Sequence, residues 1–216
     1  MKILTIGDSF TYGDELSDIK QAWPYILQNK LSCELTNLGK PATGNTSMVR
    51  NVVENAADYD LIIVAWSHFA RIEFADEYGI YDTWPGHRGI MFTDNIAYRM
   101  ELLNYINHHY NDEYLYKQYL LNIILVQTYA AQLGKRLLML NTHNKWNKLL
   151  DNSVMAKFAS LTDQINTQYF IGWPNESMMD WTFGNPKGPG GHFLAAGHKI
   201  VAEKINEHIR HLGWVS

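Results

Sequence analysis

The chain has 216 residues, of which 46% are hydrophobic and 19% charged, and its formal net charge is −4. This composition excludes a disordered chain, and the length is that of one α/β domain. Because the 18 lysines and arginines are scattered rather than clustered, the sequence argues against nucleic acid and against an anionic membrane surface as partners.

The compartment and the cofactor requirement can be inferred from features that the sequence lacks. Cys33 is the only cysteine, and the apolar stretches are too short for a signal peptide or a transmembrane helix. We therefore expect a cytoplasmic protein with no membrane insertion. The sequence contains neither a nucleotide-binding glycine motif nor a His, Cys and acid cluster at metal-ligand spacing, so we expect no cofactor and no metal.

The first half of the chain alternates short apolar runs with helical patterns. Strands are predicted at 2–6 and 33–36, with a helix at 21–31 between them. Asn45 is placed to cap the helix that follows. The apolar face of that helix is formed by Met48, Val49, Val52, Val53 and Ala56.

The second half continues this alternation. Residues 61–66 are continuously apolar (LIIVAW), which is typical of a central parallel strand covered on both faces. A long helix at about 112–133 leads into a strand at 136–140, and a shorter strand is predicted at 169–171. The closing helix spans 195–212.

Strands that alternate with helices predict βαβ units and a parallel sheet. The expected fold is therefore α/β, a three-layer α/β/α sandwich with a flavodoxin-like sheet of about five strands. In such sheets the ligand crevice lies at the carboxyl ends of the strands. Ser9, Gly44 and Ser67 all follow predicted strands, so we expect them at this crevice.

Residues 72–111 do not fit the alternation, because many aromatic residues are combined there with Pro and Gly. We interpret this segment as an insertion in a single domain that spans the whole chain, either a lid over the crevice or a surface excursion. Exposed aromatic side chains often line carbohydrate sites. Trp66 and Trp84 are therefore candidate substrate-binding residues, together with Asp8 and Asn45 near the strand ends.

A nucleophile and a base can be chosen from their places in this pattern. Ser9 ends the Gly-Asp-Ser turn after the first strand, so it projects into the crevice. A serine hydroxyl is a weak nucleophile until a positioned base takes its proton. His192 can be this base, because it follows the glycine-rich loop 188–191 (GPGG) directly before the closing helix.

Together these segments resemble the SGNH (GDSL-type) hydrolase family of esterases, lipases, thioesterases and carbohydrate acetylesterases. The similarity extends over essentially the whole chain. It rests on IGDSFTYG at 6–13, AWP at 22–24, NLG and GNTS between 37 and 47, and HFLAAGH at 192–198. The resemblance implies the SGNH hydrolase fold and needs neither a metal nor a cofactor.

The resemblance also implies roles for single residues. Ser9 would be the nucleophile, and its own N–H would donate to the oxyanion that forms during attack. His192 would be the general base. Gly44 would supply the second oxyanion donor, with Gly39 as the alternative.

Two blocks depart from the family pattern. The family has an Asn after the central strand, whereas this chain has Trp-Ser-His-Phe, so Ser67 or His68 would have to donate instead. The family's Asp-x-x-His carries its acid three residues before the His, a position that Pro189 occupies here. Asp180 is the nearest upstream acid, and a backbone carbonyl that leaves a Ser-His dyad is the alternative.

The sequence thus predicts a serine esterase that hydrolyses a carboxylic ester through an acyl-enzyme on Ser9. The expected substrate is a small-molecule or carbohydrate ester, such as an O-acetyl group on a sugar. The missing Asn and Asp motivate a second hypothesis, a non-catalytic module that binds a glycan or small ligand on the same scaffold. A third is a flavodoxin-like protein in which Gly-Asp-Ser occurs by chance.

Overall fold

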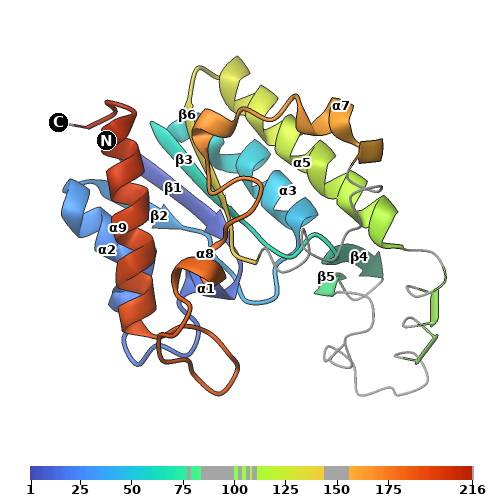
Figure 1. Cartoon of the computed structure of the whole chain (residues 1–216), viewed down its shortest axis with the longest axis horizontal. Helices are drawn as coiled ribbons and strands as arrows, with labels where there is room; N and C mark the ends of the chain where they lie inside the picture. Colours follow the sequence, from blue (N-terminus) through green and yellow to red (C-terminus); the bar gives the residue numbers. More distant parts are fainter. Residues whose placement is uncertain are drawn as a thin grey trace.

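The computed structural model describes residues 1–76, 79–83, 100–101, 104–105, 108, 111–143 and 156–215. A five-stranded parallel sheet forms its centre, in the order β2-β1-β3-β6-β7 (Figure 1). The strands are β1 (Lys2–Gly7), β2 (Glu34–Asn37), β3 (Leu61–Trp66), β6 (Arg136–Asn141) and β7 (Phe170–Ile171). This topology confirms the predicted α/β fold with a parallel sheet.

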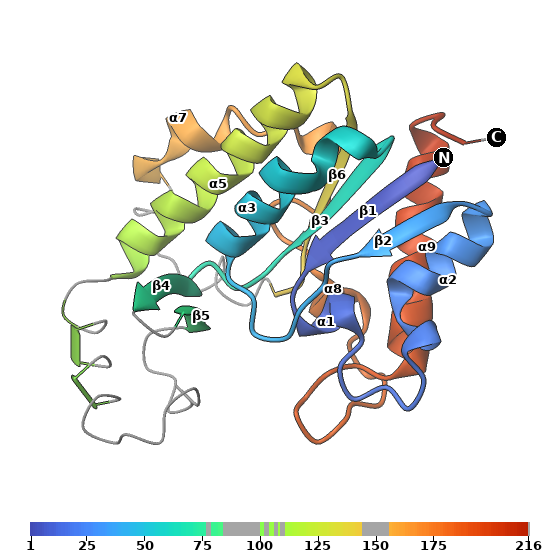
Figure 2. The ribbon, with the colours of Figure 1, turned by 180° about the vertical axis from the view of Figure 1, so that it is seen from behind.

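Helices cover both faces of the sheet and complete the three layers (Figure 1 and Figure 2). One face packs against α2 (Trp23–Leu31) and α9 (Ala195–His211), and the other packs against α3 (Asn45–Asn55) and α5 (Asp112–Gln132). Successive strand side chains point to opposite faces, so Ile63 packs with the first pair of helices and Ile62 with the second. The apolar side chains of β3 are therefore buried on both sides.

The strand register aligns the carboxyl ends of three neighbouring strands. Gly7 of β1 is level with Ala65 of β3, and Trp66 of β3 is level with Asn141 of β6. The residues that follow these three strands therefore lie together at the carboxyl end of the sheet. The short helix α1 (Ser9–Tyr12) begins there, two residues after β1 ends.

A small antiparallel hairpin lies outside the main sheet. It consists of β4 (Ile72–Asp76) and β5 (Gly79–Thr83), the first part of the predicted insertion. Glu73 anchors it to α3, because its carboxylate accepts two hydrogen bonds of 2.7 Å from Arg50 and another from the Ser47 hydroxyl. Most of the remaining insertion, with Trp84, lies outside the described residues, so its role as a lid stays a prediction.

The remaining described elements are short. They are the helices α7 (Ala159–Thr162) and α8 (Met178–Trp181) and the 3₁₀ turns Ile19–Gln21, Ala56–Asp58 and Thr167–Tyr169. Within the residues that the structure describes, no helix is long and apolar enough to cross a membrane.

Two sequence expectations near helix ends need correction. The helix predicted at 21–31 starts at Trp23, because Asp18 caps a separate 3₁₀ turn before it and Pro24 occupies the first turn of the helix. Asn45 does not cap α3. Gly44 is the N-cap residue, and the Asn45 side chain bonds instead to the segment after β3.

Candidate active site

Ser9 lies at the carboxyl end of β1 as the first residue of α1. The Asp8 carboxylate accepts a hydrogen bond of 3.1 Å from the N–H of Phe10, which fixes the start of this helix. The Ser9 side chain is largely buried, and its Oγ lies 2.8 Å from Nε2 of His192. The structure therefore brings together the serine and the histidine that the sequence selected.

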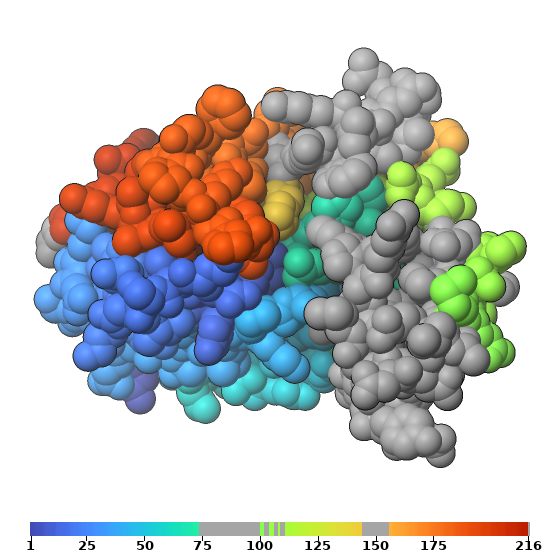
Figure 3. Space-filling model, turned by 90° about the horizontal axis from the view of Figure 1, so that it is seen from below, coloured from blue at the N-terminus to red at the C-terminus, as the bar shows by residue number. Residues whose placement is uncertain are grey.

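The other ring nitrogen of His192 contacts an acid that sequence reasoning missed. His192 Nδ1 lies 2.7 Å from Oε2 of Glu15, a residue of the loop after α1. Figure 3 shows the two segments in contact, the N-terminal one in blue and the one with His192 in orange-red. A hydrogen bond from the Gly190 backbone, together with the bonds to His192, lowers the pKa of Glu15. Glu15 is therefore a carboxylate at neutral pH.

Asp180, the acid suggested by the sequence, has a different partner. Its carboxylate accepts a hydrogen bond of 2.6 Å from the hydroxyl of Ser177, the N-cap residue of α8. A backbone carbonyl is not needed at His192 either, because Glu15 occupies that place. Ser9, His192 and Glu15 thus form a continuous hydrogen-bonded chain of the kind that activates serine nucleophiles.

His198, the second histidine of the last block, has a structural contact. Its Nδ1 accepts a hydrogen bond of 3.2 Å from the backbone N–H of Trp23, which ties α9 to the start of α2. Burial, with a smaller contribution from His192, lowers the pKa of His198 to about 3. His198 is therefore neutral at ordinary pH.

The two glycines proposed as oxyanion donors differ in what surrounds them. The N–H of Gly39 donates to the Asn37 side chain at 3.0 Å, and a Cβ at Gly39 would lie 2.6 Å from the Tyr12 backbone nitrogen. Gly39 therefore serves close packing against α1. Gly44 is the buried N-cap of the eleven-residue helix α3, a position whose backbone N–H groups suit an oxyanion.

Asn45 connects α3 to the end of β3. Its side-chain oxygen accepts a hydrogen bond of 3.0 Å from the Ser67 N–H, and its amide donates to the carbonyls of Ser67 and His68. These bonds hold the Gly44 turn against the segment that replaces the family's Asn block. Asn45 was expected to bind substrate, but its buried amide is engaged inside the protein.

Ser67 and His68 are not equivalent as third oxyanion donors. The Ser67 hydroxyl donates to Asp8 at 2.8 Å, so its proton is already used. His68 Nδ1 accepts a hydrogen bond of 3.0 Å from the Ala70 N–H. Burial, then the nearby His143 and Arg71, lower the pKa of His68 to about 3. The neutral ring therefore carries its proton on Nε2, as a hydrogen-bond donor.

Asp8 and Trp66, which the sequence suggested as substrate-binding residues, are both fully buried. Asp8 is fully buried and caps α1. Its carboxylate also accepts a hydrogen bond from the Ser67 hydroxyl and lies 3.8 Å from the Arg71 guanidinium. Trp66 is fully buried in the core, with its ring edge-on to Tyr119 at 6.2 Å between centroids. Both residues support the site from inside.

His143 is a further residue at the carboxyl end of the sheet, and it was not among the candidate site residues chosen from the sequence. It follows β6, and its ring packs edge-on against Phe10 with 5.1 Å between centroids. Phe10 also contacts the His192 ring, with 4.7 Å between centroids. Burial lowers the pKa of His143 to about 4, although the Asp8 charge acts in the opposite direction. Its place directly after a parallel strand was the signal that could have found it.

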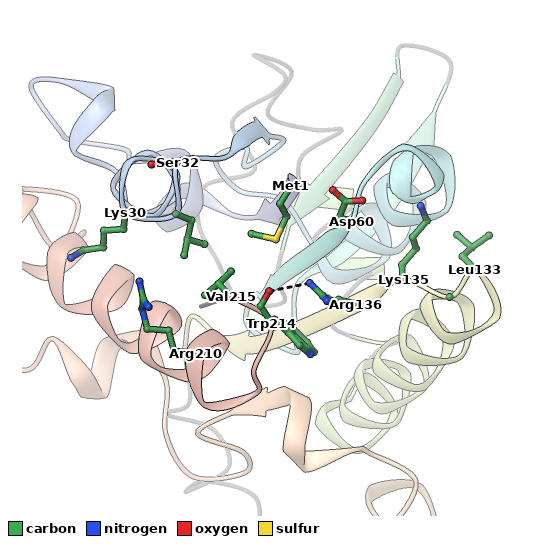
Figure 4. A pocket seen from close by; sticks show the side chains of 12 residues that line it. Met1, Lys30, Ser32, Asp60, Leu133, Lys135, Arg136, Arg210, Trp214 and Val215 are labelled. Atoms are coloured by element: carbon green, nitrogen blue, oxygen red, sulfur yellow. Dashed lines mark hydrogen bonds between the residues drawn. The ribbon is translucent and has the colours of Figure 1, made fainter.

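A cavity lies at the amino ends of the strands, away from Ser9. Its volume is about 710 Å³, and several cationic side chains line it (Figure 4). Lys30 and Arg210 belong to the last turns of α2 and α9, where a cation interacts favourably with the helix dipole. Lys30 also pairs with Glu203 at 2.7 Å. The helix ends thus account for two of the cationic side chains that line this cavity.

Solved structures of the same architecture include TesA and the esterase EstA from Pseudoalteromonas sp. TesA has a TM-score of 0.59 and 14% identity, with 98% of this chain and 99% of that chain covered. EstA has a TM-score of 0.59 and 10% identity, with 98% and 97% covered. The chain has the SGNH hydrolase fold.

Carbohydrate esterases also share this SGNH fold. The acetyl xylan esterase Est2A from Butyrivibrio proteoclasticus aligns with a TM-score of 0.56 and 14% identity, over 99% of this chain and 65% of that chain. No protein-family model and no curated protein matches the sequence. The similarity to these esterases therefore concerns the fold, and the roles of single residues rest on geometry.

Proposed function

We propose that this chain is a serine esterase that hydrolyses a carboxylic ester through an acyl-enzyme on Ser9. The observation that carries the proposal is the 2.8 Å contact between Ser9 Oγ and His192 Nε2, with His192 Nδ1 bonded to Glu15. The SGNH esterases with which the chain shares its fold support the same reaction class.

The reaction proceeds in two balanced steps. His192 takes the Ser9 proton while Oγ attacks the acyl carbon, and the resulting imidazolium gives that proton to the departing alcohol. The acyl group is then bonded to Ser9. Water attacks the same carbon with His192 again as base, and the carboxylic acid leaves as Ser9 recovers its proton.

Three N–H groups are proposed to bind the oxyanion of each tetrahedral intermediate. They are the backbone N–H groups of Ser9 and Gly44 and the Nε2–H of His68. Asn45 holds the Gly44 turn and the His68 backbone together, which supports placing these two donors at one site. Each such donor typically contributes about 2.7–4 kcal/mol of transition-state stabilisation.

The proposed substrate is an O-acetyl group on a carbohydrate. Sharing the fold with an acetyl xylan esterase supports this choice. Tyr12 lies on α1 with Ser9, and its side chain is 44% exposed, so its ring is available to stack on a sugar. The non-catalytic binding module is the weaker alternative, because Glu15 supplies the acid whose absence motivated it.

Hydrolysis of p-nitrophenyl acetate and of acetylated xylan tests this proposal. We expect wild type to turn over, and Ser9→Ala and His192→Ala each to lose roughly 10⁶-fold in kcat. Ser160→Ala, a matched change at an exposed serine, should behave as wild type. If Ser9→Ala and Ser160→Ala have the same activity, Ser9 is not the nucleophile.

A further inference from the structure

The Glu15 carboxylate accepts hydrogen bonds from three N–H groups of the His192 loop. These are the backbone N–H of Gly190 at 2.6 Å, the backbone N–H of His192 at 3.1 Å, and Nδ1 of the His192 ring at 2.7 Å. An ionised carboxylate can only accept, so it selects the ring tautomer with the proton on Nδ1. That tautomer leaves the Nε2 lone pair facing the Ser9 hydroxyl.

The loop around Glu15 has glycines where a side chain would collide with this carboxylate. A Cβ at Gly188 would lie 2.6 Å from Cδ of Glu15, and a Cβ at Gly190 would lie 3.1 Å from Oε2. A Cβ at Gly188 would therefore displace the Glu15 carboxylate, and one at Gly190 would be in tight contact with it. The glycine-rich sequence before His192 is explained by the carboxylate that it surrounds.

The backbone of Glu15 is itself in an unusual conformation. Its φ is +64°, in the left-handed region that residues with a Cβ adopt at a cost in free energy. The strained residue is the one whose side chain contacts His192. This coincidence favours a functional reason for the conformation over a purely local one.

The two buried histidines near His192 are neutral at ordinary pH. Burial lowers the pKa of His143 to about 4 and that of His198 to about 3. Lys187, on the same loop, is exposed and is electrostatically coupled to His143. Glu15 is therefore the negative charge in direct contact with the imidazole of His192.

We propose that Glu15 is the positioning residue of this active site, in the role that the Asp of Asp-x-x-His has in the SGNH pattern. It fixes the tautomer of His192 and stabilises the imidazolium that forms when Ser9 attacks. The acid therefore lies in the loop after α1, whereas the SGNH pattern has it three residues before the His, where this chain has Pro189. This inference rests on the esterase function proposed above.

Steady-state kinetics as a function of pH test it, with Glu15→Gln, Glu15→Asp and the matched control Glu54→Gln at an exposed site of α3. We expect Glu15→Gln to lower kcat by roughly 10²–10⁴-fold with little change in KM. The acidic limb of its pH–rate profile should move to lower pH, because a neutral neighbour stabilises the imidazolium less. Glu15→Asp should recover part of the loss, and Glu54→Gln should match wild type.

A structural role alone would not move the pH limb, so this readout separates positioning from misfolding. Proton NMR adds a measurement that does not depend on activity. The downfield resonance of the His192 Nδ1 proton, expected for a bond to a carboxylate, should be present in wild type and lost in Glu15→Gln.

The outcomes distinguish the two proposals. If Glu15→Gln keeps the wild-type kcat and pH limb while Ser9→Ala is inactive, the esterase stands and the role of Glu15 is refuted. If wild type itself hydrolyses no ester, the proposed function fails and the role of Glu15 fails with it.

Discussion

Replacing His68 with alanine removes the side chain that we propose as an oxyanion donor, at the place where SGNH hydrolases have an Asn. The ring is held by the hydrogen bond of 3.0 Å from the Ala70 N–H to Nδ1, and the side chain is 5% exposed. Because burial, above all, lowers the pKa of His68 to about 3, the ring stays neutral over the ordinary assay range. The proposed donor is therefore the Nε2–H of a largely buried ring, and such donors act most strongly where water is excluded.

We expect His68→Ala to lower kcat for p-nitrophenyl acetate by about 10²–10³-fold, or roughly 2.7–4 kcal/mol, with little change in KM. The donor acts mainly on charge that develops during attack, which is why kcat carries the loss. His68→Asn returns the amide of the family pattern and should keep most of the activity. His211→Ala, at an exposed position near the end of α9, is the matched control.

His68→Ala also removes the acceptor of the Ala70 N–H, which costs about 1–3 kcal/mol of unfolding free energy when that group stays buried. Urea unfolding of each variant therefore accompanies the kinetics. The reasoning is refuted if a folded His68→Ala protein keeps the wild-type kcat, or if only its KM changes.

Three further predictions follow from other contacts of the site. Asn45→Ala should lower the unfolding free energy by about 1–3 kcal/mol in urea titrations and reduce kcat more than it raises KM, because the Ser67 N–H loses its acceptor. An unchanged kcat would contradict this. Gly188→Ala should lower kcat, since its Cβ would meet the Glu15 carboxyl at 2.6 Å, and normal kinetics would show that the loop does not need glycine there. Stability should fall on acidification from about pH 6.5 towards about pH 4, because buried His198 stays neutral in the folded state, with a pKa of about 3, while the unfolded chain takes up the proton. Urea unfolding at both ends of this range measures the loss, which should be smaller in His198→Gln; equal slopes with pH would contradict the assignment.

The fold was predictable because its signals are local. The central strands β1, β3 and β6 are short apolar runs separated by helical patterns, so the alternation predicted a parallel sheet. Helix starts were less predictable. Asn45 has the residue type of a cap, yet its amide makes tertiary hydrogen bonds to the end of β3, and Gly44 takes the cap position.

The candidate site was predictable only where a motif fixed it. Ser9 and His192 belong to sequence blocks, and the structure places them in contact. Glu15 could not be found in this way, because its partner His192 is 177 positions away and no spacing links the two. Trp66 was misplaced for another reason, since a strand buried on both faces does not reveal which side chains reach the crevice.

Labelling with a fluorophosphonate, followed by peptide mass spectrometry, tests whether Ser9 is a nucleophile activated by His192. The probe reacts with a serine whose hydroxyl is activated by a base, whatever the natural ester. We expect one phosphonylated residue, Ser9, in wild type and strongly reduced labelling of that residue in His192→Ala. Wild type that leaves Ser9 unlabelled, or equal labelling in both proteins, would contradict the assignment of Ser9 and His192 as an activated pair.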